Sequence, residues 1–188
     1  MPLYLPGRGS LPAPAAGQYM LPLSQGSAST SVTLGNGTLR LGPWVLERTL
    51  TIDRIGGEIT AAGEAGSVLR LGIYSDNGNA YPNALLLDGG TIDGTSATTQ
   101  VATVSLTLAP GLYWIGGAVQ AAPSSQPTVR IASNPTIPLA LGLGTGLPGA
   151  STSAVGFSQT SVTGALPSTF SASVSSTGSV PRLLVRAA

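Results

Sequence analysis

The 188-residue sequence contains no cysteine and no histidine, and all eight of its basic residues are arginine, so lysine is absent as well. Without cysteine the chain can form neither a disulfide framework nor a thiolate metal site. Without histidine and lysine it has no imidazole general base, no Ser-His-Asp triad and no Schiff-base amine. The remaining route to catalysis is a pair of carboxylates, as in glycoside hydrolases.

Charge is also scarce, since charged residues make up 8% of the chain against about 25% in typical soluble domains. The net charge of +1 creates no field that would attract nucleic acid or anionic lipid. No apolar run is long enough for a membrane-spanning helix. The N-terminus also lacks the charged and apolar regions of a secretory signal. We therefore expect no nucleic-acid partner, no membrane insertion, and synthesis in the cytoplasm without a signal peptide.

The centre of the chain, from Arg48 to Gln120, consists of short apolar or alternating runs bounded by turn-forming residues. Such runs are typical of β-strands, and no window of similar length carries apolar residues at helical spacing. The run from Leu112 to Val119 is apolar on both faces, which predicts a central strand covered on both sides. We predict an all-β fold, an antiparallel β-sandwich, whose long connections favour a jelly-roll topology.

Composition divides the chain into four parts. Residues 1–30 contain five prolines and are predicted to form an extended arm. Residues 31–134 carry the predicted sandwich, and residues 180–188 supply its closing strand. Residues 135–179 hold no charge and are rich in Gly, Ser and Thr. We expect these 45 residues to form a weakly structured excursion that is ordered by neighbouring subunits.

The arm and the excursion carry scattered apolar side chains that we expect at subunit interfaces. These candidates are Leu5, Tyr19, Leu147, Phe157 and Phe170. Ordering each backbone unit costs about 1–2 kcal/mol of conformational entropy, and identical neighbours are the simplest source of compensating contacts. The prediction is therefore a symmetric homo-oligomer.

The acidic residues are the only candidates for catalysis. They are Glu47, Asp53, Glu58, Glu64, Asp76, Asp88 and Asp93. Most lie in turns beside glycine or asparagine, or next to an arginine, so we interpret them as structural and predict no enzyme, no catalytic residue and no cofactor.

The loop Asp76–Asn79 offers several oxygens, as calcium loops do, but lacks the downstream glutamate of an EF-hand. An Asx turn explains this loop without a metal, and Ca²⁺ stays the alternative. Exposed aromatic rings stack on sugars. Tyr81, together with Tyr74 and Asn79, is therefore the candidate glycan contact, whereas the apolar flanks of Tyr113 and Trp114 favour a place in the core.

Six segments of the chain together resemble virion proteins of tailed bacteriophages that infect GC-rich bacteria, which are described as minor tail, head-fibre or decoration-type proteins with a jelly-roll domain. The segments are Arg54–Glu58, Ala62–Gly66, Arg70–Tyr74, Pro82–Leu86, Asp93–Thr95 and Leu108–Trp114. The resemblance covers about residues 44–131 and the final strand.

It implies a non-enzymatic structural component on the virion surface, minor tail or fibre-like. It also implies a trimer that contacts other virion proteins and host cell-surface polysaccharide. A capsid decoration protein and a soluble carbohydrate-binding module are the alternatives.

Overall fold

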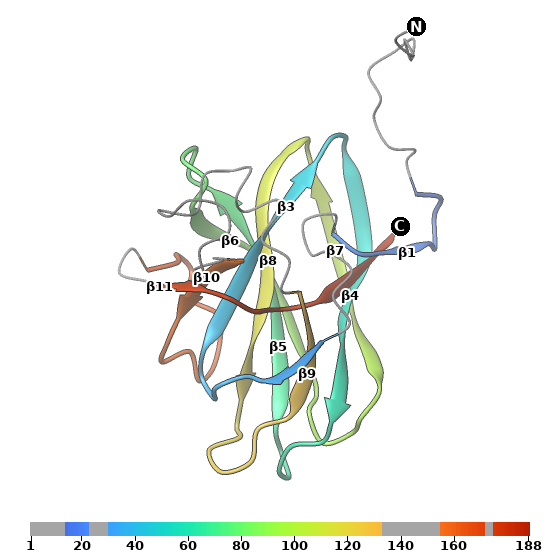
Figure 1. The fold of residues 1–188 in the computed structure, drawn as a ribbon. Helices are drawn as coiled ribbons and strands as arrows, with labels where there is room; N and C mark the ends of the chain where they lie inside the picture. Colours follow the sequence, from blue (N-terminus) through green and yellow to red (C-terminus); the bar gives the residue numbers. More distant parts are fainter. Residues whose placement is uncertain (1–13, 23–29, 133–154, 172–174) are drawn as a thin grey trace, which may run out of the picture.

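The structure, a computed structural model of the chain, describes residues 14–22, 30–132, 155–171 and 175–188. Within these ranges there is no helix, and thirteen strands form two antiparallel sheets that pack face to face (Figure 1). The predicted all-β sandwich is therefore confirmed. None of the described residues forms a helix that is long and apolar enough to cross a membrane.

The first sheet contains seven strands, and β4 lies at its centre. Its main path runs β1 (Tyr19–Met20), β13 (Leu183–Ala187), β4 (Leu50–Ala61), β9 (Thr128–Ala132) and β12 (Val180–Pro181). Two further strands branch from this path, β2 (Ser31–Thr33) beside β9 and β7 (Thr99–Leu108) beside β4.

The second sheet contains six strands, and β3, β8 and β5 form its middle. Its order is β11 (Ser175–Thr177), β10 (Gly156–Gln159), β3 (Leu39–Leu46), β8 (Gly111–Gln120), β5 (Val68–Asp76) and β6 (Pro82–Asp93). Pro43 of β3 lies beyond the three residues that pair with β10. Proline has no amide hydrogen to donate, and at this position β3 has no partner on the β10 side among the described residues.

The main hydrophobic core lies between the two sheets. The first sheet contributes Ile52, Ile55 and Val185, among others, and the second contributes Leu71 and Ile115. Side chains on one face of a strand recur every second residue, so each strand delivers alternate residues to this layer. Complete burial of such a side chain stabilises the fold by about 1.5–3 kcal/mol.

A second apolar layer covers the opposite, outer face of the second sheet. Trp114 and Ala118 of β8 face this layer, while Ile115 and Val119 of the same strand face the main core. The prediction of a central strand covered on both sides is therefore confirmed. The cover consists of residues 155–171, here called the covering segment, which contribute Val162, Leu166 and Phe170.

The covering segment lies inside the predicted excursion, and its structure corrects the expected boundary at residue 134. Its first part is β10, which pairs with β3 through Phe157↔Leu41 and Gln159↔Leu39. These residues belong to the sandwich because strand pairing and apolar anchors give them contacts within the same chain. The other residues of the excursion between 135 and 154, and residues 172–174, lie outside the described residues.

Part of the predicted N-terminal arm also belongs to a sheet. Strand β1 pairs with β13 through Tyr19↔Arg186 and Met20↔Val185, and the Gly17 amide donates to the Ala187 carbonyl at 2.8 Å. Strand β1 is thus a short edge strand, and the turn before it is also tied to β13, rather than both belonging to a free arm. The closing strand β13 lies between β1 and β4, beside one of the first strands of the chain.

Two glycine pairs lie within strands. The sequence predicts a bend at Gly56 and Gly57, but β4 continues through both residues. A Cβ at Gly56 would collide with the Gln100 carbonyl of β7, so close approach of the strands explains the glycine. At Gly116 and Gly117 the sequence predicts close approach of a neighbouring strand. This is confirmed, because Cβ atoms there would collide with the carbonyls of Arg40 and Arg70.

Candidate functional site

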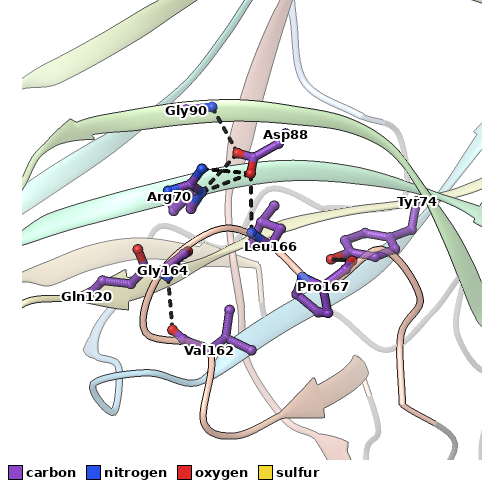
Figure 2. A network of polar contacts seen from close by, with 9 residues as sticks. All are labelled: Arg70, Tyr74, Asp88, Gly90, Gln120, Val162, Gly164, Leu166 and Pro167. Atoms are coloured by element: carbon purple, nitrogen blue, oxygen red, sulfur yellow. Dashed lines mark hydrogen bonds and ion pairs between the residues drawn. The ribbon is translucent and has the colours of Figure 1, made fainter.

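A network of polar contacts joins the covering segment to the outer face of the second sheet (Figure 2). At its centre Asp88 of β6 binds Arg70 of β5 in a bidentate ion pair, with N–O distances of 2.9 Å from Nε and 2.7 Å from Nη2. The same carboxylate accepts a hydrogen bond from the backbone amide of Leu166 at 3.2 Å and another from that of Gly90 at 3.2 Å. One carboxylate therefore links two strands and the covering segment.

The charge of Asp88 is favoured at this position. Partial burial opposes ionisation, but the hydrogen bonds from Arg70, Leu166 and Gly90 outweigh it, so the pKa of Asp88 lies below its ordinary value of 3.8. Asp88 is thus a stable anion that holds donors in place, because a carboxylate accepts hydrogen bonds and donates none.

Two other side chains of the second sheet bind carbonyl groups of the covering segment. The Tyr74 hydroxyl donates to the Pro167 carbonyl at 2.9 Å. The buried Gln120 amide donates to the carbonyls of Val162 at 2.9 Å and Gly164 at 2.8 Å. These bonds satisfy backbone groups that would otherwise be buried without partners. Figure 2 shows the segment curving over the sheet along these contacts.

Strand alternation explains why β5 supplies so much of this surface. Arg70, Gly72 and Tyr74 are two residues apart and share the outer face. Leu166 packs directly above Gly72, where an added Cβ would collide with the leucine side chain. The glycine therefore leaves the space that the covering segment needs to lie on the sheet.

Five aromatic rings pack together between the second sheet and the covering segment, to which Phe157 and Phe170 belong. Tyr81 lies 4.7 Å from Phe157 and 6.1 Å from Phe170 between ring centroids, and Trp114 lies 5.3 Å from Phe157. The Tyr81 hydroxyl donates to the Ser171 carbonyl at 2.9 Å. Burial raises the pKa of the phenols of Tyr81 and Tyr74, since both are withdrawn from solvent.

These placements revise the predicted glycan contacts. Tyr74 is fully buried, so its assignment as a sugar-stacking residue is wrong; the covering segment takes the face that a sugar would need. Tyr81 is half-buried and its hydroxyl is bound within the chain. Asn79 is exposed in the turn that precedes Tyr81, and its backbone amide donates to Asn77 Oδ1 at 2.8 Å. Trp114 is buried as predicted, and Tyr113 is half-buried against the main core.

The predicted interface residues fall into three groups. Phe157 and Phe170 pack inside the second apolar layer, so they do not require a neighbouring subunit to bury them, and that argument for self-association fails. Tyr19 is 50% exposed, and the Arg186 guanidinium lies 5.7 Å from its ring centroid. Leu5 and Leu147 lie outside the described residues.

The candidate calcium loop forms local turns. Asp76 accepts hydrogen bonds from the Gly78 amide at 2.6 Å and from the Trp114 indole at 2.9 Å. With the Asn77 bond to Asn79, these contacts match the Asx-turn interpretation. Across the described ranges, no group of three or more His, Cys, Asp or Glu side chains is placed to hold a metal ion.

Two further acids hold arginines on the outer face of the first sheet. Asp53 binds Arg186, with Nε 2.8 Å from Oδ1, and Glu58 binds Arg130, with Nη2 2.7 Å from Oε1. These hydrogen bonds lower the pKa of both carboxyls, against a smaller effect of burial. Arg182 adds a second ion pair to Glu58 at 3.4 Å.

Sequence reasoning missed Gln120 and the whole set of contacts between sheet and covering segment. The available signal was strand β8, which is apolar on both faces. This pattern requires a cover but does not indicate which residues provide it.

The fold and this site together define a β-sandwich whose second sheet is packed on both faces. A scan against protein-family models finds no match to the chain, and a search of curated proteins finds none either.

Proposed function

We propose that this chain is a non-enzymatic structural component of a tailed-phage virion, a minor tail or fibre-like surface protein with a jelly-roll type of sandwich. The non-enzymatic part of this proposal rests on the contacts that the acidic side chains make. Asp53, Glu58 and Asp88 are bound to arginines, and Asp76 and Asp93 form turns. Side chains that hold the fold together in this way are poorly suited to proton transfer.

The acidity of these groups supports the same conclusion. A glycoside hydrolase needs one carboxylic acid that stays protonated near neutral pH, hence with a raised pKa, close to a second carboxylate. Hydrogen bonding lowers the pKa of Asp53, Glu58 and Asp93, and it outweighs burial at Asp88. Each is therefore ionised near neutral pH.

The virion assignment draws on the family resemblance, and the fold is consistent with it. Four of the resembling segments occupy successive strands of one sandwich: Arg54–Glu58 in β4, Arg70–Tyr74 in β5, Pro82–Leu86 in β6 and Leu108–Trp114 across the β7–β8 turn. A sandwich with two apolar layers and few charged residues suits permanent packing in a particle. The expected partners are further copies of the chain and other virion proteins.

The proposed contact with host polysaccharide rests on two side chains. With Tyr74 buried, these are Tyr81, whose hydroxyl binds the covering segment at Ser171, and Asn79 in the exposed turn before it. Among the described aromatic residues, only Tyr19 is largely exposed, and it packs with Arg186. This arrangement does not favour a carbohydrate-binding module that acts free in solution.

Immuno-electron microscopy with antibodies against the purified chain tests the proposal. Label on the tail is the expected result, and label on the head would assign the protein to capsid decoration instead. Unlabelled particles, combined with a monomeric chain that binds host glycan in calorimetry, would overturn the virion role in favour of the soluble module. A Tyr81→Ala variant, with Tyr113→Ala as control, would show whether that binding uses the predicted contact.

A further inference from the structure

Strand β7 forms an open edge of the first sheet. Within the part of the chain that the structure describes, β7 pairs with β4 and with no strand on its other side. The Thr98 carbonyl accepts a hydrogen bond from the Ile59 amide of β4 at 3.0 Å. Because main-chain groups alternate in direction along an antiparallel strand, those of Thr99, Val101 and Thr103 point away from β4. This edge therefore presents donors and acceptors to a further strand.

Apart from a register shift against β4 between Thr103 and Leu106, the edge lacks the features that normally prevent pairing with another chain. Natural sheets protect their edges with charged residues, prolines or very short strands. The ten residues of β7 contain no charge, no proline and no glycine. By contrast, the edge strand β6 carries Pro82, Asp88 and Asp93, β12 is two residues long and contains Pro181, and β1 is two residues long. Among the described edge strands, β7 is the long unprotected one.

We propose that β7 pairs antiparallel with β7 of a second copy, so that the first sheet continues across a two-fold dimer. In an antiparallel pair, two directly opposite residues have their side chains on the same face of the sheet. The two-fold axis must therefore pass through a residue, because an axis between two residues would place inward-facing side chains opposite outward-facing ones. An axis at Thr103 uses nearly the whole strand. It places Thr99 opposite Thr107, and Val101 opposite Ser105, on the outer face of both copies.

The side chains favour a second copy as the partner. The outer face already joins threonines across strands, with Oγ1–Oγ1 distances of 2.9 Å for Thr51 and Thr107 and 3.1 Å for Thr33 and Thr128. The same chemistry recurs between Thr99 and Thr107 of two copies, and no charge opposes it. On the inner face, Ala102, Val104 and Leu106 already pack against the main core. Pairing would bring this half-buried row of one copy next to the same row of the other.

The N-terminal arm is a poorer partner for this edge. Its five prolines cannot donate to a ladder of hydrogen bonds. The inference does not depend on where the protein acts, so it can fail while the virion role holds, and the reverse is equally possible.

Cysteine cross-linking tests the dimer directly, because the native chain has no cysteine. A two-fold axis at Thr103 brings the two Thr103 residues opposite each other at about 5.5 Å between Cα atoms, within disulfide reach. Thr103→Cys should therefore form a covalent dimer on mild oxidation. Thr91→Cys, at an exposed position of β6, is the matched control and should stay largely monomeric. Equal cross-linking of both variants would overturn the proposal.

A second experiment places charge on the edge. The double variant Val101→Lys/Thr103→Lys should weaken dimerisation at least about tenfold in analytical ultracentrifugation, because lysines on an edge strand block strand addition. Val45→Lys, at an exposed position of β3, is the control and should leave dimerisation unchanged. Thermal unfolding should show that both variants are folded. A native chain that is monomeric at high micromolar concentration, or a dimer that resists the double variant, would overturn the proposal.

Discussion

The carboxylate of Asp88 accepts a hydrogen bond from the backbone amide of Leu166, 78 residues later in the chain, at 3.2 Å. This bond joins the edge strand of the second sheet to the segment that covers it. Because Asp88 is also paired with Arg70, a single acid couples strand pairing to closure of the second apolar layer. The layer should therefore respond strongly to changes at this position.

Replacing Asp88 with asparagine should destabilise the protein by about 1–3 kcal/mol in urea unfolding. The new amide keeps the shape but turns one acceptor oxygen into a donor, which then faces Arg70 or the Leu166 amide. Asp93→Asn is the control, since that carboxylate binds Thr95 within an exposed turn. Amide exchange at Leu166 should accelerate only in the Asp88 variant. Equal losses of stability in the two variants would contradict this role of Asp88.

Gly72 and Leu166 should be energetically coupled. Gly72→Ala should cost about 1–3 kcal/mol because its Cβ would collide with Leu166. Leu166→Ala should cost about 2–5 kcal/mol through lost burial and the cavity it leaves. In the double variant the smaller residue 166 makes room for the new methyl group, so the combined loss should be less than the sum. Strictly additive losses would show that the two side chains do not share this space.

Acid should destabilise the protein below about pH 4, with little change between pH 5 and 8. The pKa values of Asp53, Glu58, Asp88 and Asp93 lie below their ordinary values of 3.8 for aspartate and 4.5 for glutamate. The unfolded chain therefore binds protons first as the pH falls, and the stability from these groups is lost as the pH then falls through the folded-state values. Without histidine, no side chain with an ordinary pKa titrates between pH 5 and 8.

Urea titrations across this range measure the effect. Asp88→Asn should flatten the acid limb, because that position no longer titrates. A steep loss of stability between pH 5 and 8 would contradict the assignment.

Core substitutions should separate a central position from an edge position. Leu71→Ala should cost about 2–5 kcal/mol, since Leu71 is fully buried between the sheets. Leu106→Ala should cost less, because Leu106 of β7 is only half-buried at the edge of the same core. Chemical unfolding of both variants checks the order. A larger loss for Leu106 would indicate that another chain or segment covers the edge of β7, which would also bear on the dimer proposal.

Local patterns predicted most of the fold. Alternating apolar residues located β5 and the second half of β7. These predictions succeed because strand periodicity is a property of a few neighbouring residues. They were less successful at glycines. Gly56 serves close strand packing, which the sequence cannot distinguish from a bend.

The candidate site could not be predicted in the same way. Tyr74 had the pattern of an exposed aromatic residue because it alternates with Leu71 and Ile73, which face the main core. Its burial depends on Pro167 and Leu166, which lie more than 90 residues away. Likewise, the low-complexity composition around Phe157 and Phe170 carried no sign of the sheet that receives them.

The sequence by itself determined that this is a charge-poor, all-β chain without the residues of most catalytic and metal sites, and that β8 must be covered on both faces. Only the tertiary structure decided that residues 155–171 of the same chain provide the cover, that Asp88 and Gln120 hold it, and that β7 is left at an edge among the described strands. The reason is physical. Composition and periodicity act over a few residues, whereas contacts between distant segments depend on shape complementarity and hydrogen-bond geometry that exist only once both segments are folded.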